Sequence, residues 1–329
     1  SAPGLGRQAT RQCRATGGQD AMYATKRWVK AVSVLPLVVI LGIFTFEWYA
    51  YNVLFALPLL RFWEGDELNV ALFKTALFNA FWLLAMWSWG MACFSDPGLI
   101  PDEWASYMRE WETTGVRGAA AHDWDPRKTS VCWQCQTRRP ERAHHCAICG
   151  RCVMRMDHHC PWIGNCVGFK NHKYFILMTF YGMLACVMVA LTALPMIKGM
   201  FFGSPRPMMF RQAMKAGPYM TFSLACVLAV SFGIALLLLF LSHIWLLCVN
   251  LTSIEVGNLG RNPFFLSPHI NAQQVMGRLD LTWFLPVPAA QPLSDGLSFP
   301  SRQTEPQQNI ELEPMTVGRR GGDDSDGEP

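Results

Sequence analysis

Four long apolar runs are the main feature of the pattern of hydrophobic and polar positions along this chain. A helix needs about 20 apolar residues to cross a bilayer, and the runs at 31–54, 70–94, 174–197 and 219–249 are long enough. Residues 234–241 are apolar on every face, and their run continues beyond the usual length of a helix in a soluble core. The pattern therefore predicts an all-α membrane protein with four transmembrane helices.

The polar segments around these runs divide the chain into further regions. We expect an N-terminal segment at 1–30, a long loop at 95–173 between spans 2 and 3, and a C-terminal segment at 250–285 with a short interfacial or docked stretch. The spans form two pairs, at 31–94 and 174–249. After residue 286 the composition turns to Pro, Gln, Ser, Gly and acid, which predicts a disordered tail at 286–329.

Loop charges predict the orientation. The N-terminal segment and the loop at 95–173 are rich in Arg and Lys, whereas residues 61–68 carry three acids against one Arg, so the basic segments should face the cytosol. The basic loop at 198–218 argues against this arrangement, but the two other loops outweigh it. We expect both termini in the cytosol of a multi-pass protein of the Golgi, the endoplasmic reticulum or the plasma membrane.

Composition and charge narrow the function classes. Hydrophobic residues make up 51% of the chain and charged residues only 16%, which is unlike a soluble protein. The net charge of +4 is too small and too dispersed to indicate nucleic-acid binding. Residues 1–30 carry basic side chains without an apolar core, so we expect no secretory signal peptide.

Seven of the twelve cysteines crowd into the loop between spans 2 and 3, with histidines between them. Two-residue gaps between thiols let both sulfurs reach one tetrahedral ion, which indicates structural zinc. Two closed sites need eight ligands, and the part of the loop from Cys132 onward offers seven cysteines and five histidines, so at least one cysteine can be spare. Cys160 stands out because His158 and His159 precede it directly, with Asp157 before them.

The motif Asp157-His158-His159-Cys160, followed by Pro161-Trp162 and Asn165-Cys166-Val167-Gly168, resembles the cysteine-rich domain of DHHC-type protein S-acyltransferases (palmitoyltransferases). Other matches are Asp96-Pro97-Gly98 to the family's DPG motif, Thr252-Ser253-Ile254-Glu255 to its TTxE motif, and residues 271–277 to its C-terminal asparagine segment. Two positions differ, because Ser253 replaces the second Thr and Met276 replaces an aromatic residue. The resemblance does not cover the two tails.

This resemblance implies the metal ligands. One structural Zn²⁺ would be bound by Cys132, Cys135, His145 and Cys152, and a second by Cys146, Cys149, His159 and Cys166. The choice of His145 over His144 rests on the resemblance alone. Cys160 and His158 then remain free of metal.

The mechanism implied is two-step acyl transfer from acyl-CoA, such as palmitoyl-CoA, to cysteine thiols of membrane-associated proteins. An unperturbed thiol has a pKa of about 8.5 and needs a base to become a nucleophile at neutral pH. His158 would take the proton from Cys160, and Asp157 would fix the tautomer of His158. Filled zinc sites leave no position for water, so both ions would be structural.

The sequence also predicts roles for residues at single positions. Phosphates of CoA would meet four side chains of the loop, or these side chains form only a basic, solvated surface: Arg138, Arg139, Arg142 and His144. Ser253 would hydrogen-bond Asp157, Glu255 would anchor the segment after the last span, and Asn271 would cap a helix or bind backbone groups. Glu47 and Ala185 would lie at the far end of an acyl cavity, unless Glu47 belongs only to an interfacial belt. We expect His243, deep in the fourth span, to be a packing residue.

Two other function classes remain open. A membrane-anchored zinc module that only binds partners would need no spare cysteine. An ion transporter would carry polar side chains along its spans, where Glu47 is the main example. The sequence does not reveal the protein substrates or an accessory subunit.

Overall fold

The computed structural model describes residues 19–60, 64–115, 124–202, 216–257 and 262–302. Its helices are α1 (Gln19–Tyr49), a π-helical stretch η1 (Ala50–Ala56), α2 (Leu57–Leu60), α3 (Gly65–Phe94), α4 (Asp102–Thr114), the 3-10 turn η2 (Pro126–Lys128), α5 (His172–Phe202), α7 (Ala216–Val249), α8 (Pro268–Met276) and the 3-10 turn η4 (Leu281–Phe284). Its strands are β1 (Ser130–Cys132), β2 (Thr137–Arg139), β3 (His144–Cys146), β4 (Arg151–Val153), β5 (His158–Cys160) and β6 (Asn165–Val167).

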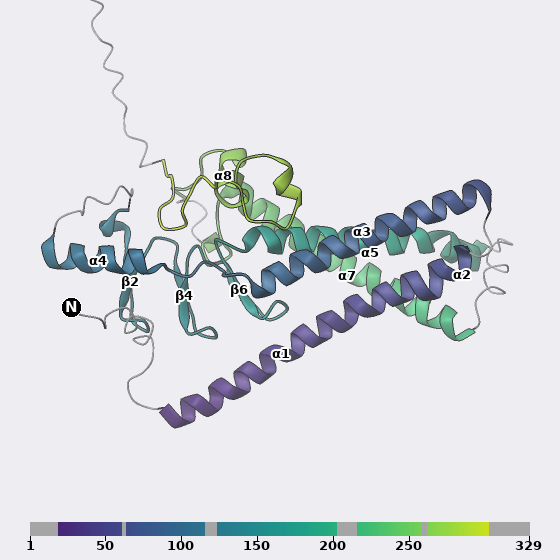
Figure 1. The fold of residues 1–329 in the computed structure, drawn as a ribbon, viewed down its shortest axis with the longest axis horizontal. Helices are drawn as coiled ribbons and strands as arrows, with labels where there is room; N and C mark the ends of the chain where they lie inside the picture. Colours follow the sequence, from purple (N-terminus) through teal and green to yellow (C-terminus); the bar gives the residue numbers. More distant parts are fainter. Residues whose placement is uncertain (1–18, 61–63, 116–123, 203–215, 258–261, 303–329) are drawn as a thin grey trace, which may run out of the picture.

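Four helical segments are long and apolar enough to cross a bilayer: 34–56, 65–94, 172–194 and 220–249. The predicted runs match these segments to within a few residues at each end. Helices α3, α5 and α7 run side by side along the long axis of the molecule, and α1 crosses them at an angle. The strands and α4 lie toward one end of these helices, and α8 lies beside that end (Figure 1). Helix α1 begins at Gln19, so it extends into the segment at 1–30 that we expected to precede the first span.

Aromatic side chains form the core between the helices at the end far from the strands. The ring of Tyr51 stacks on Phe78 with centroids 4.0 Å apart, and Phe55 stacks on Phe222 at 4.4 Å. Tyr51 and Phe55 both lie in η1, so this π-helical stretch directs two large rings toward other helices. Such pairs add about 0.5–1.5 kcal/mol each beyond burial.

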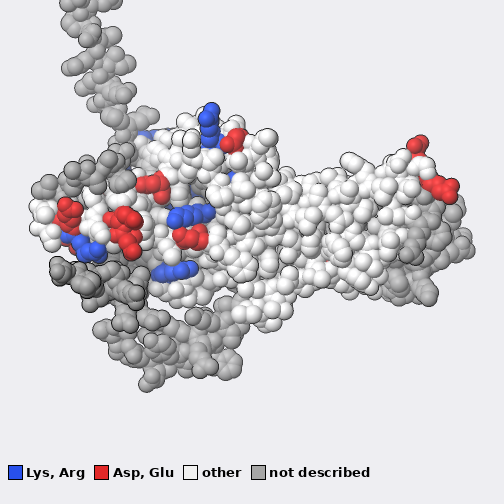
Figure 2. Space-filling model, in the orientation of Figure 1, with Lys and Arg blue, Asp and Glu red and all other residues white. Residues whose placement is uncertain are grey.

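Charged side chains are absent from most of the helical surface. Figure 2 shows this part of the molecule almost without Lys, Arg, Asp or Glu, while both charge types gather at the end that carries the strands and acidic residues lie at the opposite end. At that opposite end Glu64 precedes α3, and Asp66 and Glu67 lie in its first turn. This distribution suits helices whose middle faces hydrocarbon.

Three antiparallel hairpins form the cysteine-rich region: β1 with β2, β3 with β4, and β5 with β6. The prediction of an all-α protein is therefore wrong for this part of the chain. Each strand has three residues, which is too short for a period-two pattern to be visible in the sequence. The hairpins form because tight turns are needed to bring the paired ligands together.

The last hairpin is attached directly to the helices. The side-chain amide of Asn165 donates to three carbonyl groups at the end of α3, those of Ala92, Cys93 and Ser95, over 3.0–3.2 Å. Gly168 lies so close to Pro97 that a Cβ there would overlap the Pro97 backbone oxygen. The strand that pairs with Cys160 is thus fixed to the end of the second span.

Residues 286–302 pack against the cysteine-rich region, so the prediction of disorder from residue 286 is wrong for this stretch. Leu297 and Phe299 are buried in a cluster with Trp104 and Phe169. The backbone N–H of Phe299 also donates to the carboxylate of Glu141 over 2.8 Å. Leu297 and Phe299 are two apolar residues in a segment whose average composition is polar, so composition alone did not indicate that this segment packs. Residues 303–329 of the expected tail lie outside the described residues.

Candidate active site and metal centres

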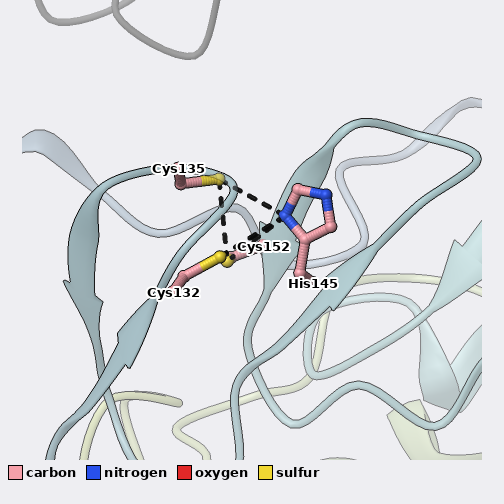
Figure 3. A group of neighbouring side chains, drawn as sticks. All are labelled: Cys132, Cys135, His145 and Cys152. Atoms are coloured by element: carbon pink, nitrogen blue, oxygen red, sulfur yellow. Dashed lines mark hydrogen bonds between the residues drawn. The ribbon is translucent and has the colours of Figure 1, made fainter.

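The first two hairpins build one cluster of metal-binding side chains, Cys132, Cys135, His145 and Cys152. The three sulfurs lie 3.4–3.9 Å from His145 Nδ1, and they converge with it on one point (Figure 3). In a tetrahedral zinc site, with Zn–S about 2.3 Å and Zn–N about 2.0 Å, neighbouring ligand atoms lie roughly 3.5–3.8 Å apart. The cluster therefore has the dimensions needed to hold such an ion.

The second cluster repeats this arrangement one hairpin later, with Cys146, Cys149, His159 and Cys166. Its sulfurs lie 3.4–3.7 Å from His159 Nδ1, and the sulfurs of Cys149 and Cys166 are 3.5 Å apart. Among the described residues, these two sets contain the same residues as the two ligand sets implied by the family resemblance. His144 belongs to neither set.

Strand register explains why these ligands meet. His145 is directly opposite Cys152 in the second hairpin, and His159 is directly opposite Cys166 in the third. Opposite residues in an antiparallel pair direct their side chains to the same face of the sheet. The second and third hairpins thus each offer a histidine and a cysteine to one site, and the preceding hairpin supplies the remaining two thiols from the end of its first strand and from its turn.

Cys160 belongs to neither metal cluster. Its side chain is buried, and it packs with Trp89, Ile163 and Phe175 where β5 meets the spans. The strand partner of Cys160 is Asn165, which is bound to the end of α3. A thiol that is not needed for metal binding is therefore held at the junction between the cysteine-rich region and the helices.

Asp157 and His158 form the polar side of this junction. His158 Nδ1 lies 2.6 Å from Asp157 Oδ2, and the Cys160 thiol is near enough to affect the pKa of the same imidazole. Burial of the ring lowers the pKa of His158, but the hydrogen bonds and negative charges of Asp157 and Cys160 outweigh it and raise the pKa to about 9. His158 is thus a strong proton acceptor toward Cys160.

Asp157 is fully buried and remains ionised. Burial raises the pKa of its carboxyl, but hydrogen bonds from His158 and from the backbone N–H of Ser253 outweigh burial and lower the pKa well below its ordinary value. The Ser253 N–H donates to Asp157 Oδ1 over 2.7 Å, while the Ser253 hydroxyl donates to the backbone carbonyl of Asp157. Ser253 therefore reaches Asp157, as we expected, although its hydroxyl does not bind the carboxylate.

The four side chains predicted to meet CoA do not lie in equivalent surroundings. Arg138 donates to Glu112 over 2.7 Å, and Arg139 donates to Ser130 over 2.8 Å, and both stay partly exposed. Burial, together with the charges of Arg139 and Arg142, lowers the pKa of His144. His144 is therefore a neutral group at neutral pH.

Arg142, the fourth of these side chains, is buried and bound within the protein. Its side chain is 2% exposed and makes a bidentate ion pair with Glu255 over 2.8–2.9 Å. Its remaining donors bind the side-chain and backbone oxygens of Asn250 over 3.0 Å. All three guanidinium nitrogens are thus bound inside the protein, so the prediction that Arg142 contacts CoA is wrong. A carboxylate 113 residues away in the sequence takes the place that we assigned to a phosphate.

Glu255 and Asn271 both anchor the C-terminal segment. Burial raises the pKa of Glu255, but the hydrogen bond and charge of Arg142 outweigh it and lower the pKa below the ordinary value. Asn271 is fully buried in α8, where it accepts from the Leu266 N–H and donates to the Cys248 carbonyl over 2.7 Å. Asn271 therefore joins the segment after the fourth span to the end of that span.

Glu47 and Ala185 are both buried between the helices. Neither carboxylate oxygen of Glu47 has a hydrogen-bond partner, although both are shielded from solvent. Phe46, the residue before Glu47, packs against the buried cluster that contains Ala185, so the two predicted acyl-cavity positions lie in the same part of the bundle.

Sequence reasoning missed Arg155 and Asn250 near the site, and it assigned His243 only a packing role. Arg155 and Asn250 are fully buried polar side chains, and both adopt a left-handed backbone. His243 lies against the ring of His158, with centroids 5.9 Å apart. An arginine two residues before Asp157 and a histidine inside an apolar span were the available indications in the sequence.

Comparison with known proteins gives one consistent result. A family model described as DHHC palmitoyltransferase matches residues 126–259. The chain is 32% identical to palmitoyltransferase ZDHHC20 of Mus musculus over 83% of this chain and 79% of that protein. It is 31% identical to ZDHHC20 of Homo sapiens, over 83% and 78% of the two chains. It is also 29% identical to probable protein S-acyltransferase 13 of Arabidopsis thaliana, over 86% and 96%.

Proposed function

Because this chain belongs to the DHHC palmitoyltransferase family, we propose that it is a protein S-acyltransferase that carries its acyl group on Cys160. The observation that carries this proposal is the arrangement of three side chains outside both metal clusters. The Cys160 thiol is near enough to His158 to raise the pKa of its imidazole, and His158 is held by the ionised carboxylate of Asp157 at 2.6 Å. This is the arrangement of an activated cysteine nucleophile, its base and the group that orients the base.

The reaction follows from these positions. His158 takes the proton of Cys160, and the Cys160 sulfur attacks the carbonyl carbon of the acyl-CoA thioester. The bond from this carbon to the CoA sulfur breaks, and the CoA thiolate leaves with a proton. A cysteine thiolate of the protein substrate then attacks the Cys160 thioester, and Cys160 leaves as the thiolate. Both steps exchange one thioester for another, and they predict ping-pong kinetics.

We propose that each four-residue cluster binds one structural Zn²⁺. The support is the donor set of three thiols and one imidazole, with ligand atoms at tetrahedral separations. Zinc at these sites would supply folding energy, because the cysteine-rich region has three-residue strands and little apolar core of its own. Four protein ligands leave no open position at either ion.

The placement of the nucleophile fits a substrate that lies in the bilayer. Cys160 packs against α3 and α5 where these helices meet the hairpins, so an acyl chain on its sulfur can enter the apolar bundle. We propose that Glu47 and Ala185 lie at the end of this path. CoA itself stays in the cytosol, with Arg138, Arg139 and His144 as candidate contacts for its phosphates.

The remaining assignments follow from this reaction. The termini and the cysteine-rich region face the cytosol, where acyl-CoA is available, and the acceptors are membrane-associated proteins that present a cysteine near the bilayer surface. The bilayer is therefore a partner of the enzyme. The regions 95–173 and 250–285 act together, because Ser253 and Glu255 bind Asp157 and Arg142 of the loop.

Incubation of the purified protein with labelled palmitoyl-CoA tests this function. Wild type should become labelled through a bond that hydroxylamine cleaves, and Cys160→Ser should remain unlabelled while it keeps two zinc equivalents. Cys248→Ser, a thiol outside the site, is the matched control and should label like wild type. Loss of one zinc equivalent from Cys160→Ser would show that Cys160 is a ligand. An unlabelled wild-type protein would favour the module that only binds partners.

The ligand set has its own test. Cys146→Ala and His159→Ala should each release metal and lower the thermal stability of the protein, because each leaves a site with three ligands. Two zinc equivalents retained in either variant would refute the assignment of the second cluster.

A further inference from the structure

A chain of three buried polar side chains connects the cysteine-rich region to two membrane helices. Arg155, before β5, and His172, the first residue of α5, are fully buried, and His243 in α7 is 4% exposed. Arg155 Nη1 lies 3.0 Å from His172 Nδ1, and His172 Nε2 lies 3.0 Å from His243 Nδ1. None of the three belongs to either four-residue metal cluster.

The direction of these hydrogen bonds follows from the chemistry of arginine. A guanidinium group only donates, so His172 Nδ1 must accept, and the hydrogen of this imidazole must be on Nε2. That hydrogen is donated to His243 Nδ1, which therefore accepts. His243 then carries its hydrogen on Nε2. One buried arginine thus fixes the tautomers of two histidines in succession.

The far end of this chain touches the catalytic pair. The ring of His243 lies 5.9 Å from that of His158 and 4.9 Å from that of Phe175, measured between centroids. Phe175 in turn meets the His158 ring edge to face at 5.4 Å. One nitrogen of His243 also lies within 4.8 Å of side-chain atoms of both Asp157 and His158. The His158 ring is therefore enclosed on the side of the membrane helices.

We propose that Arg155, His172 and His243 are positioning residues that hold the imidazole of His158 in the orientation needed to take the proton from Cys160. This inference rests on the proposed function and deepens it. His158 uses Nδ1 for Asp157, so only Nε2 is left to meet the thiol.

The position of that nitrogen depends on the rotation of the His158 ring. The rings of His243 and Phe175 fill the space beside the His158 ring, with centroids 5.9 and 5.4 Å from it, and they limit this rotation. His243 cannot leave this space without abandoning a buried hydrogen bond to His172. His172 is held in the same way by Arg155, so the orientation of the base is set by a residue that never contacts the thiol.

Two amide substitutions of His243 separate this role from simple packing. The side-chain oxygen of Asn can occupy the position of imidazole Nδ1, whereas that of Gln reaches the position of Nε2 and leaves His172 without its acceptor. In single-turnover autoacylation, His243→Gln should slow acyl-enzyme formation about tenfold, within the range that general-base catalysis supplies. His243→Asn should remain within about threefold of wild type. The KM for palmitoyl-CoA and the zinc content should be unchanged in both.

Arg155→Met tests the other end of the chain. It frees the tautomer of His172 and should slow the same step by a similar factor, although Arg155 does not contact Cys160. Because the three residues act in series, the double variant Arg155→Met/His243→Gln should be no slower than the slower single variant. The single variant Arg155→Met also tests the positioning role if His243→Gln does not fold.

Labelling of the wild-type protein distinguishes a failure of the proposed function from a failure of the positioning role. If wild type is not labelled by palmitoyl-CoA, the proposed function itself fails. If wild type is labelled and both His243→Gln and Arg155→Met form the acyl-enzyme at the wild-type rate, the positioning role is refuted. Equal slowing by the Asn and Gln variants, or multiplied effects in the double variant, would also refute it.

Discussion

Replacing Arg142 by Met should destabilise the protein without weakening its affinity for acyl-CoA. Arg142 lies between the first two hairpins and extends to the segment after the fourth span, where its guanidinium binds Glu255 and Asn250. The guanidinium also lies over the rings of Phe264 and Phe299 at 4.5 and 4.7 Å. The side chain therefore joins three parts of the chain that are distant in sequence.

The magnitude follows from burial. The Arg142 and Glu255 side chains are 2% and 15% exposed, so removal of the arginine leaves a largely buried carboxylate without its partner. Loss of one member of a buried pair costs about 3–5 kcal/mol. For a protein of this size, that corresponds to a fall in the unfolding midpoint on the order of 10 °C. Replacement by Met keeps most of the apolar contact with the two rings, so the loss reports mainly on the ion pair.

The assay is thermal unfolding in detergent, combined with the KM for palmitoyl-CoA in autoacylation. The double variant Arg142→Met/Glu255→Gln should be more stable than Arg142→Met alone, because it leaves no unpaired charge. Arg139→Met is the matched control, since Arg139 is partly exposed and hydrogen-bonds the neutral side chain of Ser130. Its loss should change stability by less than about 1 kcal/mol. An unchanged midpoint with a raised KM in Arg142→Met would refute this reasoning and return Arg142 to the CoA site.

Three further predictions follow from individual contacts. Gly168→Ala should lower thermal stability by about 1–3 kcal/mol, because its Cβ would overlap a backbone oxygen, whereas Gly257→Ala has open space and should be neutral in the same unfolding assay. Ser253→Ala should slow autoacylation only about threefold, because the backbone N–H that binds the Asp157 carboxylate remains and only one neutral hydrogen bond is lost; a loss as complete as that of Cys160→Ser would contradict this. Ala185→Phe should shift preference toward shorter chains in competition between acyl-CoAs of about 14, 16 and 18 carbons, because the added ring overfills the proposed cavity; an unchanged preference would place Ala185 outside it.

The elements that could be predicted from the sequence are those with local causes. A span is defined by its own length and apolarity, so four helices were found within a few residues of their positions. The paired thiols of Cys132 and Cys135, like those of Cys146 and Cys149, are close because two intervening residues allow nothing else. Spacing alone did not choose between His144 and His145. Strand register decides it, because His145 is directly opposite Cys152.

What the sequence by itself determined is therefore the number of spans, the metal-binding character of the loop and the identity of the spare thiol at Cys160. Only the tertiary structure decided which polar groups meet across long stretches of chain. It gave Arg142 to Glu255, placed His243 beside His158, and buried Phe299 of the expected tail. These contacts depend on the packing of helices and hairpins, and a buried charge or imidazole takes whichever partner that packing brings within reach. No pattern of neighbouring residues encodes that choice, because the free energy of each pair is set by burial and geometry that exist only in the folded protein.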